Sequence, residues 1–218
     1  MDALLERAND GGADRSARSD EGGEIRPTRA EAEAAIRTLI RWAGDDPSRE
    51  GLLETPKRVA KAYEEWFQGY NQDPAEILSK TFEEVEGYND MVMLRGIQVQ
   101  SHCEHHIVPI GGVAHVAYLP GKRVVGISKL ARLVEAYSKR LQTQETMTAQ
   151  IADALEKHLE PRGIAVVVDA THGCMSTRGV KQDNVFTLTR QFRGEFAEER
   201  RERQFWDMVR HVPATGSF

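Results

Sequence analysis

The stretch that decides the fold is residues 91–119, which read MVMLRGIQVQSHCEHHIVPIGGVAHVAYL. Two runs rich in valine and alternating apolar residues, 91–100 and 112–119, flank a polar segment with one cysteine and three histidines. Such runs are typical of β-strands. We therefore expect two neighbouring strands, with the Cys-His segment in a turn at one edge of a sheet.

Three more runs of the same kind lie further along the chain, at 123–127, 164–170 and 185–192. Apolar residues at helical spacing predict two helices between the third and fourth strands, one capped by Ser128 and one over about 144–159. Helices grouped among hairpin-linked strands indicate an α+β domain with a largely antiparallel sheet and two long helices between its strands.

The part of the chain before this domain is expected to be helical. Thr28 and Glu31 form a capping-box pattern that opens a helix ending near Gly44, and a second helix starts at Thr55 and ends near Gly69. A short third helix starts at Asp73. We expect a flexible tail at 1–27, an N-terminal helical region at 28–90 and the α+β domain at 91–218.

The composition excludes several classes of protein. Of 218 residues, 40% are hydrophobic and 29% are charged, which is typical of a soluble globular chain. The net charge of -5 argues against general nucleic-acid binding. Neither a membrane span nor a signal peptide is evident, so we expect no membrane partner and a cytoplasmic location, where a disulfide between two cysteines is disfavoured.

The two cysteines have the neighbours of metal ligands. Cys103 and His106 are three residues apart where a strand gives way to a turn, and Cys174 directly follows another strand. Three ligands with an open fourth position are typical of catalytic zinc. His105 or His172 could instead close a structural zinc site, and two unrelated buried cysteines remain a further alternative.

His105 and His172 each lie two positions from a candidate ligand cysteine. Residues two apart on an extended strand point the same way, so both imidazoles are candidates for general acid–base catalysis in the cavity that holds the metal. The alternative is a supporting role in the core. We assign structural roles to the remaining histidines, His102, His115, His158 and His211.

An anionic ligand would need local cations, since residues 120–123 lack the pattern of a P-loop. Ser128, Lys129 and Arg132 at a predicted helix N-terminus, together with Arg178, could hold a phosphate. A capped helix with a solvated basic face explains the first three equally well. By pattern alone, Gln144 and Glu145 are an ordinary first-turn pair.

Five segments together resemble the GTP cyclohydrolase I family, in the order of that family. They read GLLETPKRV at 51–59, CEHH at 103–106, GISKL at 126–130, QTQE at 142–145 and HGC at 172–174. The resemblance extends from Thr28 to about Phe196. The stretch 183–191 departs from the Thr- and Ser-rich pattern of many members.

The resemblance implies a role for each candidate residue. Cys103, His106 and Cys174 match zinc ligands, and His105 and His172 match catalytic histidines. The substrate contacts that it implies are Glu145 and Gln144 for guanine, Ser128, Lys129, Arg132 and Arg178 for triphosphate and ribose, and Arg58 and Lys61 for a neighbouring subunit's site.

The implied fold is the tunnelling fold, in which subunits pool antiparallel strands into a barrel and assemble as a homodecamer. The implied reaction is the first step of pterin and folate synthesis. Water activated by zinc adds to C8 of GTP, the imidazole ring opens, formate leaves, and a dihydropterin ring closes. The competing hypotheses are a zinc-stabilised interaction module, a related tunnelling-fold pterin or deazapurine enzyme, and a cysteine-nucleophile hydrolase.

Overall fold

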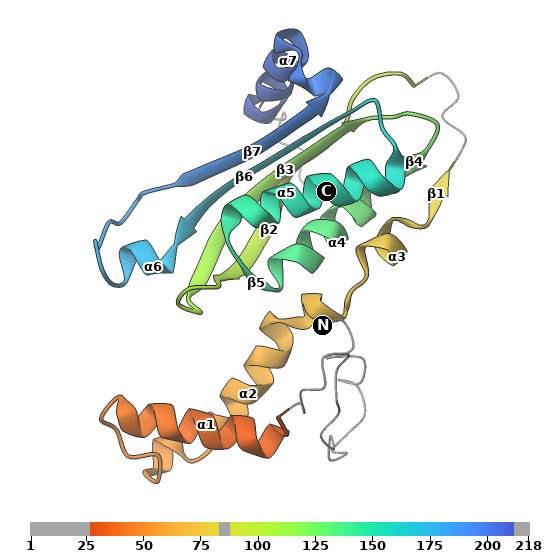
Figure 1. Ribbon diagram of the computed structural model, residues 1–218. Coiled ribbons are helices and arrows are strands. Elements are labelled where there is room, and N and C mark those ends of the chain that lie inside the picture. Colours follow the sequence, from red (N-terminus) through yellow and green to blue (C-terminus); the bar gives the residue numbers. More distant parts are fainter. Residues whose placement is uncertain (1–26, 83–87, 212–218) are drawn as a thin grey trace, which may run out of the picture. The chain divides into compact units, whose positions relative to one another are not determined.

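The computed structural model describes residues 27–82 and 88–211 (Figure 1), so most of the predicted tail lies outside the described residues. The contacts divide the chain into two compact units, which meet in sequence between Asn71 and Gln72. The described part of the first unit consists of α1 (Arg29–Trp42), η1 (Glu50–Leu52), α2 (Thr55–Trp66) and η2 (Gln68–Asn71).

Local sequence signals account for the helices of the first unit. Thr28 and Glu31 form the predicted capping box, in which the Glu31 amide donates to Thr28 Oγ1 and the Thr28 amide donates to Glu31 Oε2 at 2.7 Å. Gly44 follows α1 with φ of +97°, a conformation that glycine adopts without strain. The helix α2 ends earlier than predicted, because Gly69 belongs to η2.

The second unit is built on a five-stranded sheet in the order β5-β2-β3-β6-β7, antiparallel except for the pairing of β5 with β2. Two very short strands, β1 and β4, form a separate sheet. The elements are α3 (Pro74–Leu78), β1 (Thr81–Phe82), β2 (Val92–Cys103), β3 (Pro109–Leu119), β4 (Val124–Val125), α4 (Ile127–Ser138), β5 (Leu141–Gln142), α5 (Gln144–Leu159), β6 (Gly163–His172), α6 (Gly173–Ser176), β7 (Thr187–Gly194), η3 (Glu195–Ala197) and α7 (Glu199–Arg210).

This unit confirms the α+β class and the largely antiparallel sheet, with two corrections. The strand predicted at 123–127 is reduced to β4 and pairs with β1 outside the main sheet. Ser128 does not cap α4, because the helix begins at Ile127, two residues earlier than a Ser128 cap requires, and its N-cap is Gly126, which has no side-chain acceptor.

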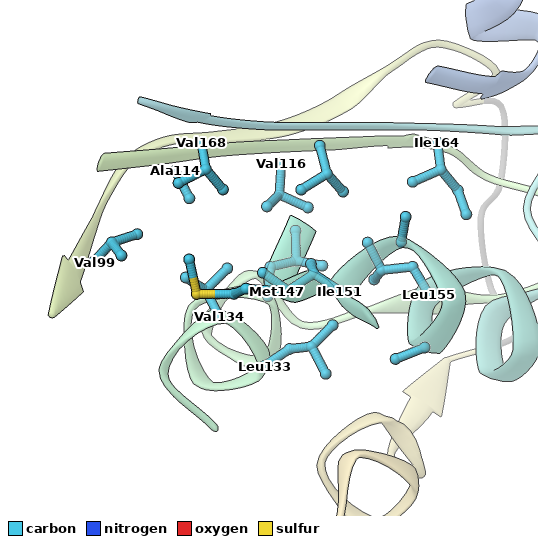
Figure 2. Packing of buried hydrophobic residues seen from close by; sticks show 14 of the residues in the cluster. Val99, Ala114, Val116, Leu133, Val134, Met147, Ile151, Leu155, Ile164 and Val168 are labelled. Atoms are coloured by element: carbon cyan, nitrogen blue, oxygen red, sulfur yellow. The ribbon is translucent and has the colours of Figure 1, made fainter. Parts of the chain in front are cut away.

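The main core lies between the sheet and the pair α4 and α5 (Figure 2). Alternate residues of the strands point to these helices, as the two-residue period of a strand requires. Full burial of one such side chain contributes roughly 1.5–3 kcal/mol. The labelled core residues are Val99, Ala114, Val116, Leu133, Val134, Met147, Ile151, Leu155, Ile164 and Val168.

A second, smaller core covers part of the opposite face of the sheet. Phe196 of η3 and Phe205 of α7 are fully buried there against small and aliphatic residues of β3 and β6. The guanidinium of Arg95 in β2 donates to the carbonyl oxygens of Met208 and Val209 near the end of α7. Side chains of β2, β3 and β6 are therefore packed on both faces of the sheet.

Gly112 lies where the backbones of β3 and β6 leave no room for a side chain. It lies opposite Ala170, and a Cβ at this position would be 2.1 Å from the carbonyl oxygen of Asp169. Only glycine fits between the two backbones here. This contact lies near the sheet edge where β2 ends, β3 begins and β6 ends.

Candidate metal centre

Two segments distant in sequence meet at this end of the central strands. The register pairs His102 with Pro109 and Ile110 with His172, so the end of β2 and the end of β6 both flank the start of β3. A tight turn follows Cys103, whose amide donates to the Val108 carbonyl at 2.9 Å. The turn brings His106 back toward Cys103, while α6 begins directly after His172 and carries Cys174.

Cys103, His106 and Cys174 have their ligand atoms within 4.8 Å of one another. The distance from Cys103 Sγ to His106 Nδ1 is 3.9 Å. Cys103 is buried, Cys174 is half-buried and His106 is exposed, so the group opens to solvent on one side. The structure thus brings together the three residues that the sequence proposes as metal ligands, and they could hold a metal ion.

The chemistry of the two thiols suits a cation. Burial raises the pKa of Cys174, and the charge and hydrogen bond of Cys103 raise it further. A bound divalent cation would reverse this effect, because metal ligation stabilises thiolates. Two sulfur donors and one imidazole form a donor set that zinc prefers.

The two neighbouring histidines are not placed by strand spacing, so that part of the sequence argument is wrong. His105 lies in the turn after β2, and Cys174 lies in the helix α6 rather than on an extension of β6. His105 Nδ1 is nevertheless 3.8 Å from Cys103 Sγ, and its ring is largely exposed beside Glu104. The catalytic assignment of His105 remains a prediction.

His172 is joined to Gln144, the first residue of α5. Its Nε2 lies 2.7 Å from Gln144 Oε1. Burial lowers the pKa of His172, and the nearby charge of Glu145 partly opposes this effect. Gln144 itself is buried, with 1% of its surface exposed, whereas Glu145 is exposed. Of the two guanine contacts that the resemblance implies, Glu145 is thus exposed and Gln144 is buried, and both assignments remain predictions.

Arg178 also reaches the candidate metal centre. Its Nη1 lies 2.7 Å from His106 Nε2, and the guanidinium can only donate, so the imidazole nitrogen accepts. The side chain is exposed, which leaves further donors of its guanidinium open to an anionic ligand. This contact brings the positive charge of Arg178 next to Cys103, His106 and Cys174, the three candidate ligands that we call the metal group.

The other predicted phosphate contacts lie elsewhere in the same unit. Ser128, Lys129 and Arg132 are on the first turns of α4, which follows β3 and β4 at the far end of the sheet (Figure 1). The opposite end of α4 leads into β5, which pairs with Cys103. A helix of 12 residues separates the two ends by about 18 Å. A single chain therefore does not bring these residues to the metal group.

Arg58 and Lys61 belong to the first unit, where both side chains are exposed on α2. The structure gives no relation between them and the metal group.

Comparison with known proteins places the chain in a family. A family model described as GTP cyclohydrolase I matches residues 32–210. The chain belongs to the GTP cyclohydrolase I family. A GTP cyclohydrolase 1 of Maricaulis maris is 70% identical over 175 residues, which cover 80% of this chain and 85% of the relative. A GTP cyclohydrolase 1 of Hyphomonas neptunium is 63% identical, with 80% of this chain and 84% of the relative covered.

Among solved structures, the apo form of an archaeosine synthase QueF-Like aligns with a TM-score of 0.41 and 17% identity, over 49% of this chain and 96% of that chain. Within the described residues, no helix combines the length and apolar character needed to cross a lipid bilayer.

Proposed function

We propose that this chain acts as a GTP cyclohydrolase I that requires zinc. It hydrolytically opens the imidazole ring of GTP, releases formate and forms 7,8-dihydroneopterin triphosphate, the first step toward tetrahydrofolate and other pterins. The observation that carries the proposal is the convergence of Cys103, His106 and Cys174 in a chain of this family. A cytoplasmic location and GTP as the principal ligand follow from the same assignment.

Zinc would be held by the two thiolates and the imidazole of this group. When bound, it supplies a Lewis acid and lowers the pKa of a water molecule, which makes an effective nucleophile at neutral pH. The partial exposure of the group, through His106, gives a substrate access to it.

His105 and His172 are proposed to move the protons that ring opening and ring closure require. His172 is half-buried, and burial lowers its pKa, which favours a neutral ring able to accept a proton. His105 lies 3.8 Å from Cys103 on the exposed side of the group. Two histidines in different surroundings can serve different proton transfers.

Glu145 is proposed to accept hydrogen bonds from the guanine edge, and Arg178 to bind the triphosphate. Glu145 is exposed beside Gln144, and its charge acts on His172, so its carboxylate lies close to the proposed proton-transfer group. Arg178 supplies several donors in a planar fork, an arrangement that suits phosphate oxygens.

A complete substrate site would combine residues of several chains. Ser128, Lys129 and Arg132 are at the far end of the sheet from the metal group, so their proposed contact with the triphosphate requires a second copy. We assign the same intersubunit role to Arg58 and Lys61. A homodecamer of the tunnelling fold would satisfy this requirement, with β7 at the edge of the sheet available to pair with a neighbour.

The experiment that tests this function is an assay of the purified protein with GTP. Formate and a fluorescent pterin, after oxidation, should appear in equal amounts, and a zinc chelator should abolish both products. A control reaction with ATP in place of GTP should yield neither formate nor pterin. Formation of formate without any pterin would contradict the proposed reaction.

A further inference from the structure

The side chain of Gln144 makes several hydrogen bonds close to the candidate site. Its amide nitrogen lies 3.0 Å from the Val168 carbonyl oxygen, 2.7 Å from the Thr187 carbonyl oxygen and 3.2 Å from Thr189 Oγ1. Its amide oxygen lies 2.7 Å from His172 Nε2. One buried side chain thus joins the start of α5 to β6, β7 and a proposed catalytic histidine.

The orientation of this amide is fixed by its neighbours. Backbone carbonyl oxygens only accept hydrogen bonds, so the atom that faces Val168 and Thr187 is the nitrogen. The two threonines of the network agree with this assignment. The Thr148 hydroxyl donates to the main-chain carbonyl oxygen of Gln144 at 2.7 Å, so it must accept from the Thr189 hydroxyl, whose oxygen is also 2.7 Å away. The Thr189 oxygen keeps a lone pair that accepts from the side-chain amide nitrogen of Gln144.

The orientation of the amide determines the proton on the histidine. Since the nitrogen of the Gln144 amide faces the carbonyl groups, its oxygen faces His172 and can only accept. His172 Nε2 is therefore the donor, and the neutral ring has its unshared electron pair on Nδ1.

We infer that Gln144 is a positioning residue, which fixes the tautomer and orientation of His172, and that its side chain does not read the guanine base. A direct contact between this amide nitrogen and guanine would break its hydrogen bonds to the carbonyl groups of Val168, which is buried, and Thr187, which is half-buried, and a buried carbonyl left without a donor destabilises the fold. The inference rests on the proposed function, in which His172 moves protons. Gln144 then supports the proposed catalytic side chain of His172 and is not itself a substrate contact.

The kinetic test compares Gln144→Met with Thr189→Val. Methionine has similar length but offers neither donor nor acceptor of comparable strength, whereas valine removes one hydrogen bond to Gln144 Nε2 and leaves the contact with His172. Gln144→Met should lower kcat by about 10- to 100-fold, with KM for GTP changed less than about threefold. Thr189→Val should lower the melting temperature while keeping kcat within about threefold of the wild type.

A double variant separates an effect through His172 from a general loss of structure. In a His172→Ala background, Gln144→Met should slow the reaction by less than about threefold, because the group that it positions is gone. If the rate losses of the two single variants multiply in the double variant, the inference is overturned. An increase in KM at unchanged kcat for Gln144→Met would also overturn it. A wild-type rate for His172→Ala would refute the proton-transfer role itself, and absence of pterin from the wild type would refute the proposed function.

Neutron diffraction from deuterated wild-type crystals gives a test that requires no variant. The inference predicts deuterium on His172 Nε2 and on the Gln144 atom that faces Val168 and Thr187. A ring with deuterium on Nδ1 alone would overturn it.

Discussion

Replacing Gly112 by alanine should force β3 away from β6 near the metal group. The new Cβ would lie 2.1 Å from the Asp169 carbonyl oxygen, 2.5 Å from Ala170 Cα and 2.6 Å from Ala170 Cβ. In proteins a Cβ atom essentially never lies within 3.0 Å of a non-bonded heavy atom, so the new Cβ and the Asp169 carbonyl oxygen must move apart by at least 0.9 Å. No rotation of a side chain relieves the clash with the two backbone atoms.

Overpacking of this kind costs about 1–3 kcal/mol and occasionally more. For a chain of this size, each kcal/mol lowers the melting temperature by about 2–4 °C, so a fall of up to about 12 °C is expected. The strand shift also moves His172, two residues beyond Ala170. A displacement of about 1 Å can cost roughly 100-fold in rate, and we expect a corresponding loss of formate release.

Gly111→Ala is a matched control in the adjacent position of the same strand. A Cβ there would have no neighbour within 4 Å, so its effect on the free energy of unfolding should stay within about 0.5 kcal/mol. Thermal unfolding by circular dichroism and formate release should be measured on both variants in parallel. Equal melting temperatures and equal rates for the two variants would refute the close approach of β3 and β6.

Four further outcomes are expected. Arg178→Ala should weaken binding of GTP far more than binding of guanosine by calorimetry, and equal losses would show that Arg178 does not bind phosphate. Arg95→Ala should cost about 1 kcal/mol and speed amide hydrogen exchange in α7, because carbonyl groups near its end lose a donor. Light scattering should give the mass of ten chains, and an active monomer would exclude shared sites. His105→Ser and His172→Ala should keep zinc but slow turnover about 10²–10⁴-fold, with a ring-opened intermediate detected by rapid quench in at least one variant; wild-type rates in both would rule out proton transfer by these residues.

Much of the second unit could be predicted from its sequence, because its strands and helices have strong local patterns. The valine-rich run of β6 and the apolar stripe of α5 both match the described elements closely. The strands β1 and β5 have two residues each, so their existence depends on tertiary pairing rather than on local sequence. The helix α7 was not predicted, although Phe205 and Val209 repeat at helical spacing in its charged sequence.

The metal group could be predicted from ligand type and spacing, whereas the role of Gln144 could not. The local pattern shows Gln144 only as a residue in the first turn of a helix, and the family resemblance implies a guanine contact for it. Its significance comes from carbonyl groups on β6 and β7 that lie 24 and 43 residues away in the chain. The distance between α4 and the metal group likewise depends on the direction in which α4 runs along the sheet, which no local pattern gives.

The most direct test of the central claim is a zinc titration of metal-free protein in which bound zinc and formate release are measured on the same samples. Activity should rise in proportion to bound zinc and reach its maximum at one zinc per chain, with Cys103, His106 and Cys174 as the ligands. Full activity in zinc-free protein, or zinc bound at this stoichiometry by a Cys174→Ala variant with undiminished activity, would contradict the account.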